Sequence, residues 1–211
     1  MTTRISRRQF LGRGGGAAAL VLSVRQPVYA QAGRKQLVYA KNEDIGQLNP
    51  YFVNHAVFET LDNHIQEPLV RFDYDKRVFE PVLAESWTTE EQARRWVFKL
   101  RDGVRFHDGS PLTAEDVKYS LEAVAKEKTA FRQKANVEMI DKISVRDKLT
   151  VVCDCGEPVP GLLSYIQSRP PIMSRALGEK VGFDEAHKKM VGTGPYKFAE
   201  YARDERLVME K

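Results

Sequence analysis

The stretch from residue 94 to residue 117 predicts a strand, a turn and a helix in that order, and it constrains the fold more than any other part of the chain. "RRWVFKLRDGVRF" alternates apolar and other residues, the pattern of a half-buried strand. An Asp102-Gly103 turn interrupts the alternation, which predicts a hairpin. The apolar positions on its inner face are Trp96, Phe98 and Leu100, then Val104 and Phe106.

A capped helix is expected to follow this hairpin. Thr113 stands three residues before Asp116, a variant of the capping box in which we expect the hydroxyl to satisfy a free N–H of the first turn. The helix should begin at about Ala114. Val117, Leu121 and Val124 then recur at helical spacing, which predicts that one face of residues 114–127 packs inward.

Between the expected hairpin and helix lies His107-Asp108, a pair that could suggest a metal site or acid/base chemistry. Asp108-Gly109 is a strong turn dipeptide, because Gly tolerates positive φ and the Asp side chain can bond to the backbone ahead of it. The remaining histidines, His55, His64 and His187, occur singly. We therefore interpret His107 as the corner of a turn, and we expect no metal ligands, no catalytic residues and no cofactor.

The positive charge of the chain is confined to its first thirty residues. The formal net charge is +4, from 33 basic and 29 acidic residues. Residues 1–30 hold five arginines and no acid, so 28 basic residues face 29 acidic ones in residues 31–211. No basic surface for a phosphate backbone is expected there, and we predict no nucleic-acid partner.

The first thirty residues have the parts of an export signal. A basic start precedes the apolar run "AAALVLSV", which is too short to span a bilayer. "SRRQFLG", from Ser6 to Gly12, resembles the twin-arginine motif, so Arg7 and Arg8 are expected to address the chain to the Tat translocase. Cleavage after Ala30 and cleavage after Ala32 both remain open.

Both cysteines of the chain stand two residues apart, at Cys153 and Cys155, in "LTVVCDCGEP". On a strand their side chains point to the same face, and a bridge between them would close a small, strained ring. We interpret them as strand residues, with a redox or adventitious metal pair as the alternative.

The remaining patterns alternate between strand and helix without a repeat, which predicts an α/β or α+β fold. A buried strand is expected at residues 36–40 and helical spacing at residues 54–65. The later expected elements are a strand in "EPLVRFD", a hairpin in "ISVRDKLTVVCD" with its turn at Arg146-Asp147, a proline-started helix in "PVPGLLSYIQ", a charged helix over residues 175–189 and two final strands joined at "ARDE". "GTGPY", residues 192–196, lacks the spacing of a phosphate-binding loop and is interpreted as a turn leading into a strand.

Three ordered segments together carry a resemblance to a known family. They are "LNP" with "EPLVRFD", then "LAESW" with "WVFKLRDGVRFHDGSPLTAEDV" over residues 83–117, and finally "VGTGPYKF". The sequence resembles family 5 of the extracytoplasmic solute-binding proteins of ABC importers, the group that takes up peptides, nickel chelates and related solutes. The resemblance extends over residues 36–211.

The resemblance implies an α/β fold of the type II periplasmic binding protein kind, a two-lobed clamp that closes on its ligand by hinge motion. Family members are two to three times this long. With the export signal expected at residues 1–30, the resemblance implies that residues 31–211 are the N-terminal part of the solute-binding domain, an incomplete lobe one.

The resemblance also implies a function without chemistry on the solute. A periplasmic binding protein of this kind captures an oligopeptide or a metal chelate between its lobes, and its closed form is recognised by the transmembrane permease subunits of the importer. The identity of the solute stays open. An exported hydrolase is disfavoured, because no set of nucleophile, base and orienting group is evident, and a structural or interaction module is a further alternative.

Ligand contacts are expected where strands end and loops begin, because these positions line the cleft in such folds. Arg169 matches a cleft arginine of some nickel-chelate and peptide-type members, and its guanidinium suits a carboxylate bidentately. A surface ion pair for Arg169, and core packing for the apolar candidates, remain open. The other candidates are Lys41, Asn42, Val53, Phe58, Phe131 and Arg132.

Overall fold

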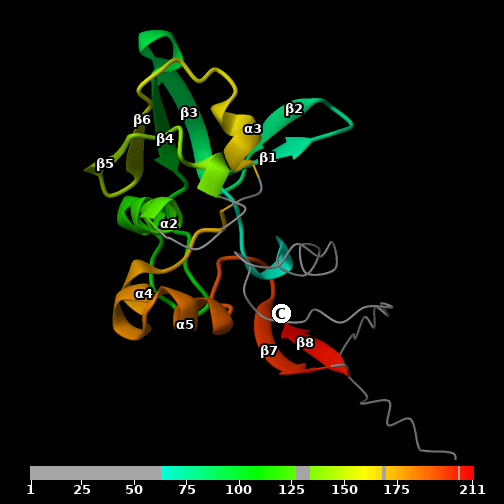
Figure 1. The fold of residues 1–211 in the computed structure, drawn as a ribbon. Coiled ribbons are helices and arrows are strands. Elements are labelled where there is room, and N and C mark those ends of the chain that lie inside the picture. The colour runs from blue at the N-terminus through cyan, green and yellow to red at the C-terminus, as the bar shows by residue number, and fades with distance from the viewer. Residues whose placement is uncertain (1–62, 127–133, 168–169, 204) are drawn as a thin grey trace, which may run out of the picture. The chain divides into compact units, whose positions relative to one another are not determined.

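The computed structural model describes residues 63–126, 134–167, 170–203 and 205–211, all of which belong to one compact unit, residues 41–211. Figure 1 shows the order of the elements along the chain. They are β1 (Val70–Asp73), β2 (Val78–Pro81), β3 (Ala84–Glu90), β4 (Arg95–Leu100), α2 (Ala114–Lys126), β5 (Lys142–Asp147), β6 (Thr150–Asp154), α3 (Leu162–Ile166), α4 (Arg175–Val181), α5 (Phe183–Lys188), β7 (Lys197–Ala202) and β8 (Arg206–Glu210).

The central element is a four-stranded antiparallel sheet in the order β3-β4-β6-β5. The expected strand at Trp96–Leu100 is confirmed as β4, but its expected hairpin partner is wrong. β4 pairs with β3 on one side and β6 on the other, whereas Arg105 forms only an isolated bridge with Pro111. Pairing of β4 with distant strands is more stable than a local hairpin, because it allows apolar side chains from several strands to pack together.

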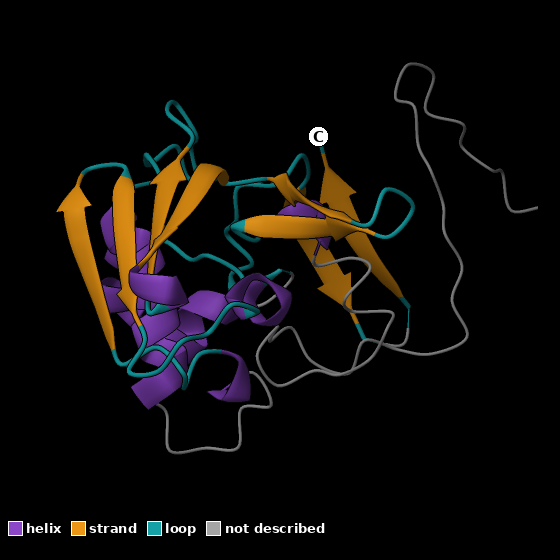
Figure 2. Ribbon diagram, turned by 90° about the horizontal axis from the view of Figure 1, so that it is seen from above, coloured by secondary structure: helices purple, strands orange, loops and turns teal. Residues whose placement is uncertain are grey.

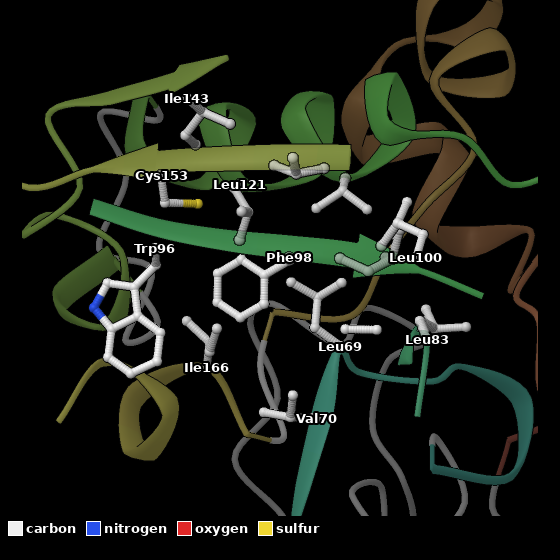
Figure 3. Close-up of a cluster of buried hydrophobic side chains, with 14 of the residues drawn as sticks. Leu69, Val70, Leu83, Trp96, Phe98, Leu100, Leu121, Ile143, Cys153 and Ile166 are labelled. Carbon is white, nitrogen blue, oxygen red and sulfur yellow. The ribbon is translucent and has the colours of Figure 1, made fainter. Parts of the chain in front are cut away.

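One face of this sheet carries the main core. Trp96, Phe98 and Leu100 alternate along β4 and are at most 4% exposed. In the antiparallel register Trp96 stands opposite Cys153 and Phe98 opposite Val151, so these side chains share a face. Figure 3 shows the resulting cluster, which also includes Leu69, Val70, Leu83, Leu121, Ile143 and Ile166.

Helix α2 begins at Ala114, as the sequence predicts, and its apolar stripe is completely buried. Val117, Leu121 and Val124 are at most 1% exposed and belong to the main core. The helices and the four-stranded sheet can be followed in Figure 2. The face of residues 114–126 that was expected to pack inward is therefore confirmed.

The charged segment expected as one helix over residues 175–189 forms two. α4 ends at Val181 and α5 begins at Phe183, because Gly182 between them has φ +88, a left-handed value that a helix does not accommodate. Helical periodicity alone did not reveal this break. The hairpin of β5 and β6 is confirmed, with its connection at residues 148–149, two residues later than expected.

The last two strands form a hairpin, as expected, and they pack on a second, smaller core. β7 pairs with β8 in an antiparallel sheet separate from the central one. Buried Ile65 and Met190 form the centre of this second core, against which pack Phe198, Tyr201, Leu207 and Met209. In the described part of the chain, no helix is long and apolar enough to cross a membrane.

Candidate functional site

The residues expected to contact ligand all lie outside the described residues, as do Arg7 and Arg8 of the export motif. They stay predictions. The seven ligand candidates are Lys41, Asn42, Val53, Phe58, Phe131, Arg132 and Arg169.

The chain that follows Arg169 is firmly anchored to α2. The backbone N–H of Met173 donates to Oγ of Ser120 at 2.9 Å, and that hydroxyl lies 2.8 Å from the carbonyl oxygen of Asp116. Ser120 is completely buried, so these bonds satisfy a polar group that would otherwise destabilise the fold. The segment leading into α4 is thus fixed on α2 by a buried hydroxyl.

The carboxylate of Asp116 makes a second link between α2 and α4. Oδ2 accepts hydrogen bonds from the backbone N–H of Thr113 at 2.8 Å and from its hydroxyl at 2.7 Å, while Oδ1 accepts from the N–H of Arg175 at 2.8 Å. The expected cap is therefore present but reversed: the Thr113 hydroxyl donates to Asp116 instead of accepting from a backbone N–H. Asp116 is 7% exposed, so its charge is stabilised by these donors.

Three segments that are distant in the sequence meet at a junction formed by residues 64–66, His107 and the loop 192–196, here named the GTG junction. The N–H of Gly194 donates to the carbonyl oxygen of Ile65 at 2.9 Å, and the N–H of Tyr196 donates to the carbonyl oxygen of His64 at 3.1 Å. A Cβ on residue 194 would lie 2.5 Å from the His64 oxygen. Only glycine allows this approach of two backbones.

His107 bonds to the same loop through its backbone and through its ring. Its N–H donates to the carbonyl oxygen of Gly192 at 2.8 Å, its Nε2 lies 2.8 Å from the oxygen of Gly194, and its Nδ1 lies 3.3 Å from the nitrogen of Gly192. The imidazole thus bonds to backbone through both ring nitrogens.

The expected turn at His107 is confirmed, but the role of the ring was not foreseen. Oδ1 of Asp108 accepts from the N–H and the hydroxyl of Ser110, and Gly109 has φ +86. The only sequence feature that could have indicated this contact is the presence of both "HDG" and "GTG" in the same chain. Their contact is a tertiary feature that neither motif reveals alone.

Two buried polar atoms belong to the GTG junction itself. Oε1 of Gln66 and Oγ1 of Thr193 have no hydrogen-bond partner among the described residues. Gln66 is 3% exposed, and its Cγ would lie 2.9 Å from a Cβ on residue 192.

Both cysteines are buried in the main core. Cys153 and Cys155 are free and buried, and Cys153 lies in β6 as the sequence predicts. Burial raises the pKa of both thiols. The thiolate is the reactive and metal-binding form, and burial disfavours it at both positions.

A hollow of about 290 Å³ lies between α2 and β5, lined by Glu122, Ala125, Val137, Ile140, Asp141, Lys142 and Ile143. This volume is at the lower limit for small-molecule pockets.

Within the described ranges, no group of three or more His, Cys, Asp or Glu side chains could hold a metal ion.

The model of the bacterial extracellular solute-binding proteins, family 5 Middle, matches residues 78–211. The glutathione-binding protein GsiB of Pectobacterium atrosepticum is 30% identical over 100% of this chain and 40% of its own length. The probable D,D-dipeptide-binding periplasmic protein DdpA of Escherichia coli K12 is 28% identical, over 90% of this chain and 39% of its own.

Solved structures show the same relationship. The periplasmic binding protein AgaA of A. tumefaciens R10, in complex with agropinic acid, is 29% identical with a TM-score of 0.72, covering 79% of this chain and 33% of that one. DppA of Helicobacter pylori, in complex with the peptide STSA, is 25% identical with a TM-score of 0.71, covering 79% and 37%.

The relatives and structural neighbours indicate both the fold and the periplasmic location. The neighbours are two-lobed periplasmic binding proteins, and this chain corresponds to part of such a clamp. Their family consists of binding proteins of transport systems and is not an enzyme family. The chain spans about 40% of the length of the curated relatives that it matches. This chain belongs to family 5 of the bacterial extracellular solute-binding proteins.

Proposed function

We propose that the chain is part of the periplasmic solute-binding component of an ABC importer, which captures a peptide or similar small solute between two lobes and delivers it to the membrane permease. The observation that carries the proposal is the match to GsiB over the whole of this chain, together with the family model over residues 78–211. A protein with this role binds its solute without changing it, so we propose no enzymatic activity.

The solute class we favour is a small molecule with at least one carboxylate. The relatives and neighbours are described as binding glutathione, D,D-dipeptides, the peptide STSA and agropinic acid, all of which carry such a group. Arg169 is the candidate that would pair with it, because a guanidinium holds a carboxylate through two parallel hydrogen bonds. The other proposed contacts are Lys41, Asn42, Val53, Phe58, Phe131 and Arg132.

Metal-chelate binding is the second candidate function. NikZ of Campylobacter jejuni, in complex with Ni(L-His), is 28% identical with a TM-score of 0.66. NikA of Brucella suis, in complex with Fe(III)-EDTA, is also 28% identical with a TM-score of 0.69. Histidine and EDTA also carry carboxylates, so Arg169 would serve in both cases.

Calorimetry with the complete protein would decide between these functions. Glutathione, a D,D-dipeptide, a tetrapeptide and Ni(L-His) would be titrated separately, each with its amidated counterpart as the matched control. We expect binding of one of the peptide-type solutes, lost on amidation. Binding of Ni(L-His) alone would establish the second function, and no binding of any carboxylate-bearing solute would contradict both.

We further propose that residues 1–30 are a twin-arginine export signal, removed after translocation, and that residues 31–211 form the N-terminal part of the binding domain. The support is the motif around Arg7 and Arg8, the short apolar run and the small residues that follow it. The Tat translocase would then be a partner during export, and the permease subunits partners afterwards.

A further inference from the structure

The hydrogen-bond partners of His107 determine which of its ring nitrogens carries the proton. The partner of Nδ1 is the backbone nitrogen of Gly192, at 3.3 Å, which can only donate. The partner of Nε2 is the carbonyl oxygen of Gly194, at 2.8 Å, which can only accept. The two contacts are satisfied together only when Nδ1 is bare and Nε2 is protonated.

This arrangement makes the imidazole an equivalent of a peptide group. The loop 192–196 pairs with the backbone of residues 64 and 65 through two N–H donors. The His107 ring offers the same loop one acceptor and one donor. The backbone N–H of His107 adds a third bond, to the oxygen of Gly192.

We propose that His107 is a positioning residue: its neutral ring, protonated on Nε2, latches the GTG loop between the His107 turn and residues 64–65, and thereby holds the β7–β8 hairpin in place. Pro195 and Tyr196 connect this loop directly to β7. The hairpin packs on Ile65 and Met190 in its own small core, apart from the main one. Loss of the latch should therefore loosen the hairpin and leave the β3–β6 sheet intact.

Substitution of His107 by asparagine or glutamine tests the two hydrogen bonds of the ring separately. His107→Asn keeps an acceptor near the position of Nδ1, and His107→Gln keeps a donor near the position of Nε2, whereas His107→Ala loses both. The matched control is Asp108→Asn, which changes the neighbouring turn residue but retains the oxygen that binds Ser110.

The first measurement is nitrogen-15 NMR of the full chain labelled at histidine, with no ligand added, so that its result is independent of the proposed function. We expect the His107 signal, assigned by its absence in His107→Gln, to show a protonated Nε2 and a bare Nδ1. A proton on Nδ1, or a mixture of the two tautomers, would overturn the proposal.

The second measurement is amide hydrogen exchange. With about fivefold for each lost hydrogen bond, His107→Ala should speed amide exchange of Gly192, Thr193, Gly194 and Tyr196 about 25-fold, and the Asn and Gln variants about fivefold each. Exchange in β4 and β6, and all exchange in Asp108→Asn, should stay unchanged. Wild-type exchange in His107→Ala, or equal effects of Ala, Asn and Gln, would contradict a latch. If β4 and β6 also lose protection, the variant has unfolded and the wild-type tautomer decides.

Discussion

Gly192 passes so close to Ile65 that a Cβ on residue 192 would lie 2.1 Å from the Ile65 carbonyl oxygen. That oxygen already accepts the N–H of Gly194 at 2.9 Å, so the two backbones cannot separate without breaking this bond. The absence of a side chain at residue 192 is therefore a condition for the GTG junction.

Replacing this glycine should strongly destabilise the chain. We expect Gly192→Ala to lower the free energy of unfolding by about 2–4 kcal/mol, because a backbone contact must open to admit the methyl group. Urea denaturation would measure the change. Gly161→Ala is the control, since its Cβ would have no neighbour within 4 Å and its φ of −92 suits any residue; we expect a change of about 0.5 kcal/mol or less. Equal effects of the two substitutions would refute the close contact.

The Asp116 carboxylate should be a second point of sensitivity. Asp116→Ala leaves the donors of Thr113 and Arg175 without their acceptor, and we expect a loss of about 2–4 kcal/mol in the free energy of unfolding. Glu115→Ala is the neighbouring control: its side chain is 45% exposed and lies 3.8 Å from Arg175, so a loss of about 0.5 kcal/mol or less is expected. Thermal and urea unfolding would compare them, and a mild effect of Asp116→Ala would show that water replaces its bonds.

Buried His187 should make stability depend on pH. It is 1% exposed, its ring lies edge-to-face 4.3 Å from Phe183, and burial lowers its pKa from 6.5 to about 3. As the pH falls through 6.5, the unfolded chain takes up a proton that the folded chain does not. Stability is therefore complete above pH 6.5 and decreases toward pH 3.

We expect a loss of about 2 kcal/mol in the free energy of unfolding between about pH 7 and pH 5 from this group. His187→Leu, which fills a similar volume and cannot titrate, should remove that part of the pH dependence. Urea denaturation at both pH values would test it. The idea fails if the variant and the wild type lose stability equally over this range.

Export should depend on the paired arginines. Replacing Arg7 and Arg8 together by lysine keeps the charge but removes the twin-arginine motif, so a reporter fused to residues 1–32 should no longer reach the periplasm. Arg13→Lys is the matched control and should be exported normally. Cell fractionation would measure this, and export of the double variant would exclude the twin-arginine route.

In the complete protein, Arg169→Ala should weaken solute binding by about 1.5–3 kcal/mol, the range for a hydrogen bond to a charged group. Arg169→Lys should recover only part of the loss, because an ammonium lacks the planar fork. Arg175→Ala is the control, since that arginine lies on α4 with Glu115 and Glu179 as partners. Calorimetry would measure all three; wild-type affinity of Arg169→Ala would remove Arg169 from the cleft.

The local elements could be predicted from the sequence. Alternation identified β4, the spacing of Val117, Leu121 and Val124 identified α2, and Asp108-Gly109 identified the turn, because each depends on interactions within a few residues. The resemblance carried by its motifs also identified the family.

Which of these elements meet depends on the complete fold. The pairing of β4 with β3 and β6, the reversed cap at Asp116 and the bonds of the His107 ring all depend on partners that the local sequence does not specify. A strand or a ring nitrogen can bond equally well to many partners, and the choice is made by burial of apolar surface and satisfaction of polar groups over the whole fold. His107 is separated from Gly194 by 87 residues, and only folding brings the two within 2.8 Å.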